Sequence, residues 1–187
     1  WKDCACIAGQ ELSKSGTPHL CASDIVEVGP AAFPDSTFQY LFPALTSFND
    51  LLGVAGVVEL EDCDNLDTIA NTFTSSTIVA VTGNCSIGGG PGATIIGNRN
   101  APLILVVNGA LSINANSDFY GIALGMTVVS LNGTATIHGS LLAEDATSLS
   151  TGGYTQVYDK DALKALAEDL ETVGLAKQKY SWTDIQP

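Results

Sequence analysis

The sequence predicts a mainly β protein, a short β-solenoid of about three coils with short helices before it and a packing helix after it. One observation is that residues 79–87, 105–113 and 129–137 match position for position, at offsets of 26 and 24 residues. Another is the composition, in which 14% of residues are charged and 45% hydrophobic, and small uncharged side chains are abundant. Finally, apolar residues at helical spacing precede and follow the repeats.

The three segments read VAVTGNCSI, LVVNGALSI and VSLNGTATI, with glycine at the same step in each: Gly83, Gly109 and Gly133. Apolar residues alternate with small or polar ones, which a hairpin meander or a β-sandwich also permits, and Asn-Gly is a strong hairpin signal. Those folds give no reason for the same pattern to recur with glycine in the same place. A coil that bends at fixed corners and stacks its inward side chains on the coil below gives that reason.

Further faces of the coils are expected at 94–96 (TII), 118–125 (DFYGIALG) and 139–145 (GSLLAED). Gly121 and Gly139 suit corners, where φ can be positive or the backbone crowded. A stack of so few coils exposes strand edges at both ends, and such edges need cover.

Residues 1–77 form the predicted N-terminal disulfide-linked and helical segment, 78–157 the solenoid region and 158–187 the C-terminal helix and tail, together one compact domain. Residues 1–32 are expected to be irregular. From residue 34, PDSTFQYLFPALTSFNDLLGVAG spaces apolar residues by three and four, with Asp35 or Ser36 as the cap. Pro43 divides this segment into two short helices. Its aromatic residues are interpreted as a packing face.

A third helix is predicted in DKDALKALAEDLETVG, residues 159–174, with Asp159 as its cap. Its apolar stripe should lie against the solenoid and is a candidate cover for an exposed strand edge. Trp182 is expected to anchor the tail. The stripe comprises Ala162, Leu163, Leu166, Ala167, Leu170 and Val173.

The five cysteines indicate a disulfide-permissive compartment, because their spacing contains no CxxC pair and neither histidine lies near paired cysteines. Cys63 with Cys85, and either Cys4 or Cys6 with Cys21, are the economical pairings. Each closes a loop of about 16 to 23 residues, worth roughly 3 kcal/mol. The fifth cysteine is left free or pairs outside this chain.

Acidic residues outnumber basic ones 20 to 7, giving a formal charge of −13. Binding to nucleic acid or to an anionic membrane depends on Lys and Arg, so both are disfavoured. The sequence has no apolar run long enough to span a membrane. It opens on Trp1 without a signal sequence, which is typical of a processed or trimmed soluble portion.

No catalytic residue, cofactor or metal is expected. Residues 88–97 (GGGPGATIIG) lack the Lys-Ser/Thr of a phosphate loop and are interpreted as a connection between coils. The acidic run 59–67 (ELEDCDNLD) suggests calcium but lacks the order of an EF-hand. His138 has no evident nucleophile or orienting carboxylate. A hydrolase-like carboxylate set remains the weakest alternative: Asp118, Glu144 and Asp145.

The chain resembles one family in PLILVVNGALSINANSDFYGIALG, LNGTATIHGSLLAED, YTQVYDKDALKAL and the closing YSWTD, and in the earlier FQYLFPALTSFNDL. It looks like the soluble region of PilX-like type IV pilus assembly proteins. These minor pilins have a glycine-punctuated β-rich region followed by a Tyr-Asp-led helix and a Ser-Trp-x-Asp motif. The corresponding residues are Tyr158, Asp159, Ser181, Trp182 and Asp184.

The resemblance implies a non-enzymatic pilus (fimbrium) subunit that acts in pilus initiation or at the tip. Its implied partners are other minor pilins, the major pilin and a tip adhesin. It also implies a removed N-terminal helix that anchors the protein in the bacterial inner membrane, facing the periplasm, before it enters the fibre or tip at the cell surface. Thr183 stands where the family often has Arg. The alternatives are an extracellular binding module for glycan, host surface or DNA, and a short β-helix carbohydrate-active enzyme.

Overall fold

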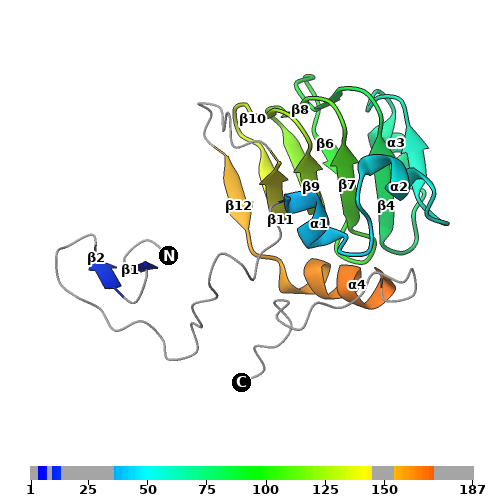
Figure 1. Ribbon diagram of the computed structural model, residues 1–187. Coiled ribbons are helices and arrows are strands. Elements are labelled where there is room, and N and C mark those ends of the chain that lie inside the picture. Colours follow the sequence, from blue (N-terminus) through cyan, green and yellow to red (C-terminus); the bar gives the residue numbers. More distant parts are fainter. Residues whose placement is uncertain (1–3, 8–9, 14–35, 145–153, 171–187) are drawn as a thin grey trace. The chain divides into compact units, whose positions relative to one another are not determined.

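The computed structural model (Figure 1) describes residues 4–7, 10–13, 36–144 and 154–170. The chain divides into two compact units, residues 1–35 and 36–187. In the first, β1 (Cys4–Ile7) and β2 (Gln10–Ser13) pair antiparallel. This pair corrects the expectation of irregular structure: only two residues separate the strands, a spacing that suits a tight hairpin. Cys21 lies outside the described residues, so its pairing with Cys4 or Cys6 stays a prediction.

The second unit is mainly β, and its parallel strands form a solenoid, which confirms the predicted fold class. The solenoid has about five turns rather than the three coils predicted from the repeats. One sheet has the strand order β12-β11-β9-β7-β4-β3, with β6 paired to β9, and a second has the order β10-β8-β5. The strands are β3 (Val58–Leu60), β4 (Thr77–Val81), β5 (Cys85–Ile87), β6 (Thr94–Ile96), β7 (Leu103–Val107), β8 (Leu111–Ile113), β9 (Ser117–Gly125), β10 (Val129–Leu131), β11 (Thr136–Ala143) and β12 (Thr155–Val157).

Each full coil contributes strands to three faces. The first face contains β3, β4, β7 and the second halves of β9 and β11. The second contains β5, β8 and β10, and the third contains β6, β12 and the first halves of β9 and β11. The long strands turn between faces at Gly121 and Gly139, which have φ of +131° and +143°. A side chain at Gly139 would overlap the Gly121 carbonyl oxygen, so this corner requires glycine.

The register corrects one part of the predicted repeat. Val129 lies beside Leu111, an offset of 18 residues, whereas Leu105 lies beside Val79, an offset of 26. Aligning 129–137 with 105–113 at an offset of 24 was therefore wrong. Gly83 and Gly109 do share a corner, but Gly133 lies at the next corner, beside Ala115. The predicted offset of 24 and the observed offset of 18 differ by six residues. An even shift leaves the inward and outward alternation of side chains unchanged, so alternation alone could not fix the register.

Apolar side chains fill the solenoid and also cover the outer side of the first face. Inward residues from all three faces form one core, with Leu105, Leu111 and Phe119 fully buried. Outward residues of the first face, such as Ile104 and Val106, are buried beneath helices. Strands buried on both sides read as continuous apolar runs, which explains TIVAV and LILVV.

Two short helices cover this face, as predicted: α1 (Thr37–Leu41) and α2 (Phe48–Leu52). Ser36 caps α1 by accepting a hydrogen bond from the Gln39 amide. A capping box between Ser47 and Asp50 begins α2. Phe38, Phe42, Phe48 and Leu51 pack against the sheet, so the interpretation of the aromatic segment as a packing face is confirmed.

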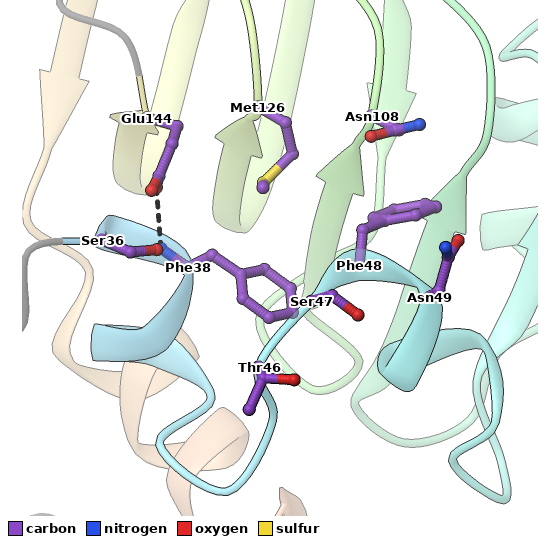
Figure 2. Close-up of a pocket in the computed structure, with 9 residues that line it drawn as sticks. All are labelled: Ser36, Phe38, Thr46, Ser47, Phe48, Asn49, Asn108, Met126 and Glu144. Carbon is purple, nitrogen blue, oxygen red and sulfur yellow. Dashed lines mark hydrogen bonds between the residues drawn. The ribbon is translucent and has the colours of Figure 1, made fainter.

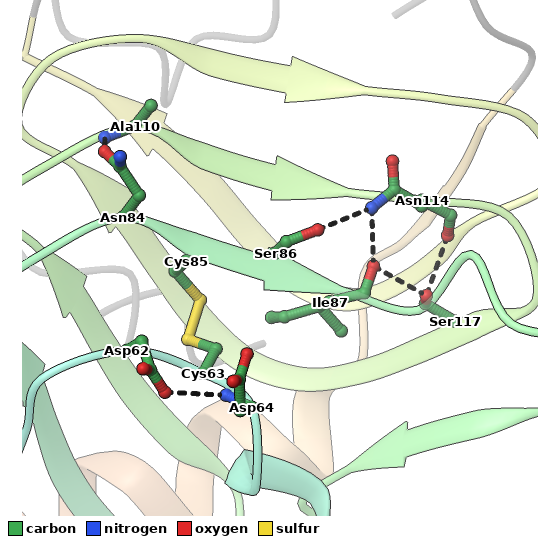
Figure 3. Close-up of a disulfide and its surroundings, with 10 residues drawn as sticks. All are labelled: Asp62, Cys63, Asp64, Asn84, Cys85, Ser86, Ile87, Ala110, Asn114 and Ser117. Carbon is green, nitrogen blue, oxygen red and sulfur yellow. Dashed lines mark hydrogen bonds between the residues drawn. A yellow bond between two sulfur atoms is a disulfide. The ribbon is translucent and has the colours of Figure 1, made fainter.

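The predicted Cys63–Cys85 disulfide is present, with the Cα atoms 4.9 Å apart (Figure 3). It joins the connection after β3 to the beginning of β5. Next to it, α3 (Leu66–Ala70) buries Leu66 and Ala70 in the solenoid core. The disulfide and α3 thus tie the first turn to the stack.

The last described helix, α4 (Lys160–Leu170), runs across the strands of the first face. Asp159 begins it and accepts a hydrogen bond from the Ala162 amide at 3.2 Å. Near its other end, Asp169 accepts a hydrogen bond from the Ser76 amide, next to the start of β4, at 2.8 Å. The helix therefore covers the apolar face, where it buries Ala162 and Leu166, rather than the edge of end strand β12. Residues 171–187, with Trp182, lie outside the described part.

No helix in the described ranges is sufficiently long and apolar to cross a lipid bilayer.

Candidate functional site

The second face presents a row of uncharged polar side chains, here called the Ser/Asn ladder: Ser86, Ser112, Ser130, Asn84, Asn114 and Asn132. Ser86, Ser112 and Ser130 occupy the same register position in β5, β8 and β10. Their neighbours in each strand point into the core, so the period of two turns the serines outward. The hydroxyls of Ser112 and Ser130 are 2.9 Å apart and hydrogen-bonded.

Asparagines continue the ladder at both ends of these strands (Figure 3). The Asn114 amide donates to the Ser86 hydroxyl and to the Ile87 carbonyl, both at 3.1 Å. The Asn132 amide donates to the Asn114 side-chain oxygen at 3.1 Å. At the other end, the Asn84 side-chain oxygen accepts from the Ala110 amide at 2.9 Å. These bonds run from coil to coil and hold the ladder in a fixed array.

Hydroxyl and amide groups both donate and accept hydrogen bonds, so the ladder can engage neutral polar partners. It carries no charge with which to hold phosphates and no imidazole or carboxylate to activate its hydroxyls. The chemistry of the ladder is that of a binding or packing surface.

A second polar cluster joins three coils to α4. The Arg99 guanidinium donates to the Asp159 carboxylate at 2.8 Å. His138 Nδ1 lies 3.9 Å from the same carboxylate, beyond hydrogen-bond distance, and its ring stacks on Tyr120 with centroids 4.2 Å apart. His138 directly precedes the Gly139 corner, and its side chain is half-buried there. The Arg99–Asp159 bond ties the start of α4 to the turn after β6, so the cluster has the geometry of a structural clasp for α4.

The Asp159 carboxylate titrates below its usual range. Burial raises its pKa, but hydrogen bonds from Arg99 and from the Ala162 amide, with the positive charge of Arg99, outweigh burial and lower the pKa. In turn, the hydrogen bond to Asp159 raises the pKa of Arg99. Asp159 is therefore a charged N-cap, which favours the first turn of α4.

The other residues singled out in the sequence do not form a site with one another. Asp118 and Glu144 lie near opposite ends of the paired strands β9 and β11, so the proposed carboxylate set does not assemble, and Asp145 lies outside the described residues. Glu144 instead accepts a hydrogen bond from the Phe38 amide at 2.9 Å and holds the start of α1. In the described part of the chain, no three His, Cys, Asp or Glu side chains are arranged to hold a metal ion.

Of the predicted C-terminal motif, Tyr158 is exposed and Asp159 is buried, whereas Ser181, Trp182 and Asp184 lie outside the described residues. The Tyr120–His138 and Arg99–Asp159 pairs escaped sequence reasoning. Tyr120 and His138 are 18 residues apart, the true coil length here, and this offset was the available signal for the first pair. Arg99 lies in a turn and Asp159 at the start of a helix, so the two residues do not occupy equivalent positions of the repeat, and no regular spacing in the sequence relates them.

Comparison with protein-family models, with curated proteins and with solved structures finds no match for this chain.

Proposed function

We propose that this chain is a structural and assembly subunit of a type IV pilus, a minor pilin acting in pilus initiation or in the tip complex. The observation that carries the proposal is the order of the motifs that resemble PilX-like proteins. All of them except the closing Ser-Trp-x-Asp motif, which lies outside the described residues, fall on described elements. The aromatic segment forms α1 and α2, the repeats form the solenoid, and Tyr158-Asp159 precede α4. The proposed partners remain other minor pilins, the major pilin and a tip adhesin, at the bacterial cell surface.

The construction of the second unit supports such a role. Its polar groups satisfy one another along the ladder, its helices cover the apolar face, and a disulfide fixes the first turn. A rigid body of this kind suits a subunit that works by packing against other subunits.

Deletion of the gene, followed by electron microscopic counting of surface pili, tests the proposal. We expect few or no pili, restored by the wild-type gene supplied in trans, and an apolar helix of about 20 residues encoded upstream of this region. Normal pilus numbers after deletion, with no such helix upstream, would contradict it.

A second candidate is an extracellular binding module that recognises its target through the Ser/Asn ladder. The observation favouring it is the fixed, uncharged hydrogen-bonding array of Ser112 and Ser130. Ser112→Arg should place a bulky charge in the array and abolish retention on a glycan array. Ser75→Arg, at an exposed turn outside the ladder, is the matched control. Equal retention of both variants would rule the ladder out as the recognition surface.

A further inference from the structure

A hollow of about 430 Å³ opens between the first face and the two covering helices (Figure 2). We propose that it binds a neutral, hydroxyl-rich ring, the terminal sugar of a glycan. It is separate from the Ser/Asn ladder and does not depend on a role in pilus assembly. Its volume falls within the range of small-ligand pockets, and its residues come from different elements. They are Ser36, Phe38, Thr46, Ser47, Phe48, Asn49, Asn108, Met126 and Glu144.

One wall of the hollow is built by the coil repeat. Asn108, Met126 and Glu144 follow the ends of β7, β9 and β11 and occupy equivalent positions in three successive coils. Backbone hydrogen bonds fix this column: the Met126 amide donates to Val107 and the Glu144 amide to Gly125, at 2.8 and 2.9 Å. Adjacent strands are about 4.8 Å apart, so an amide, a thioether and a carboxylate are presented at regular intervals.

The helices supply the opposite side. Figure 2 shows the Phe48 ring beside Asn108, with Asn49 on the same helix and the Phe38 ring nearer Met126. Phe38 and Phe48 are buried members of the first-face cluster, at 1% and 6% exposure, so their rings form the floor of the hollow and offer little surface to a ligand. The apolar patch open to a ligand is centred on the half-buried Met126 side chain and lies between polar groups.

The hydrogen-bonding groups that remain free select the ligand. Hydroxyls of Ser36 and Ser47 already cap α1 and α2, and Thr46 donates to Asp50. The exposed side-chain amides of Asn49 and Asn108 have no hydrogen-bond partner among the described residues, and each offers two donors and an acceptor. Such groups pair with adjacent hydroxyls, while the apolar patch suits the C–H face of a sugar ring.

Charge disfavours an anionic ligand. No Lys, Arg or His lines the hollow, so an anionic group would find no cation. Glu144 accepts the Phe38 amide with one carboxylate oxygen, and lysine amide serves in the test below as the cationic competitor for this carboxylate. A neutral ring is the ligand that matches both the side-chain amides and the apolar patch.

The test uses the chain of residues 1–187 and a panel of neutral sugars: glucose, galactose, mannose and N-acetylglucosamine. Binding is followed by NMR shifts of side-chain amides at up to about 20 mM, which detects millimolar affinities. We expect at least one sugar to shift the Asn49 and Asn108 amides. Asn49→Ala and Asn108→Ala should each weaken binding roughly tenfold, as loss of a hydrogen bond does. Asn71→Ala, an exposed amide after α3, should leave binding unchanged.

Circular dichroism verifies that each variant is folded, which is expected because both asparagines are exposed. The proposal is overturned if no sugar shifts these amides, or if lysine amide displaces the sugar. It is also overturned if Ser112→Arg on the ladder abolishes binding while Asn108→Ala does not. That last result would still support a binding module, so the failure of this site is distinguishable from the failure of that function.

Discussion

Removal of the Cys63–Cys85 disulfide should destabilise the solenoid unit by a predictable amount. The bonded cysteines are 22 residues apart, and the chain-entropy relation for a loop of this length gives about 3 kcal/mol at 25 °C. Both residues are buried, at 7% and 1% exposure, so substitution by alanine adds the lost packing of two sulfur atoms to this figure. Cys63→Ala combined with Cys85→Ala is the perturbation, since single variants would leave an unpaired thiol in the core.

Urea unfolding followed by far-ultraviolet circular dichroism measures the effect. With a denaturant dependence of roughly 2 kcal/mol per molar, the midpoint should fall by about 1.5 M. Reducing agent provides the internal control, because it should lower the wild-type midpoint and leave that of the double variant unchanged. A double variant that unfolds at the wild-type midpoint would refute the assignment of this cross-link as a major constraint on the unfolded chain.

Three further predictions test the corner, the register and the clasp. Gly139→Ala should cost about 2 kcal/mol or more in thermal unfolding, because φ is +143° and the Gly121 carbonyl blocks a side chain, whereas Gly90→Ala, in open space, should be nearly neutral. An equal effect of both variants would contradict the corner assignment. Cysteines at Ser112 and Ser130, neighbours in the observed register, should form a disulfide under mild oxidation, whereas cysteines at Ser112 and Thr136 should not. The reverse outcome would restore the offset of 24. Because the Asp159 pKa is lowered in the folded state, its contribution is complete above the ordinary carboxyl range near pH 4 and is lost as pH falls through the folded pKa. Asp159→Asn should therefore lower the melting temperature at pH 7, and the difference from wild type should shrink toward pH 2; a constant difference would argue against a charged cap.

Sequence reasoning succeeded where a local rule decides the structure. Ser36 caps the start of α1, and Pro43, which has no backbone amide hydrogen, ends the helical segment. Both short helices therefore appear where expected. The Cys63–Cys85 pair followed from loop economy, and β6 and β9 followed from apolar runs beside glycines. These features depend on residues close together in the chain.

Sequence reasoning failed where the structure depends on the register between neighbouring coils. Gly133 shares its Asn-Gly context with Gly109, but the coil ending there is shorter than the one before it, so sequence likeness pointed to the wrong neighbour. The hollow beside α1 and α2 could not be predicted from the sequence for the same reason. Its column of Asn108, Met126 and Glu144 has no residue type in common and becomes evident only when the coils are stacked.

The path of α4 has a consequence for how the solenoid unfolds. In an open stack of repeats each coil contacts only its neighbours, so the ends can fray while the middle persists. Here the bond between Arg99 and Asp159 holds one end of the helix, and Asp169 holds the other end beside the start of β4. A late segment thus contacts an early coil, and losing either end exposes the apolar face shared by all the coils. Such a closed arrangement favours a single all-or-none transition over stepwise loss of coils.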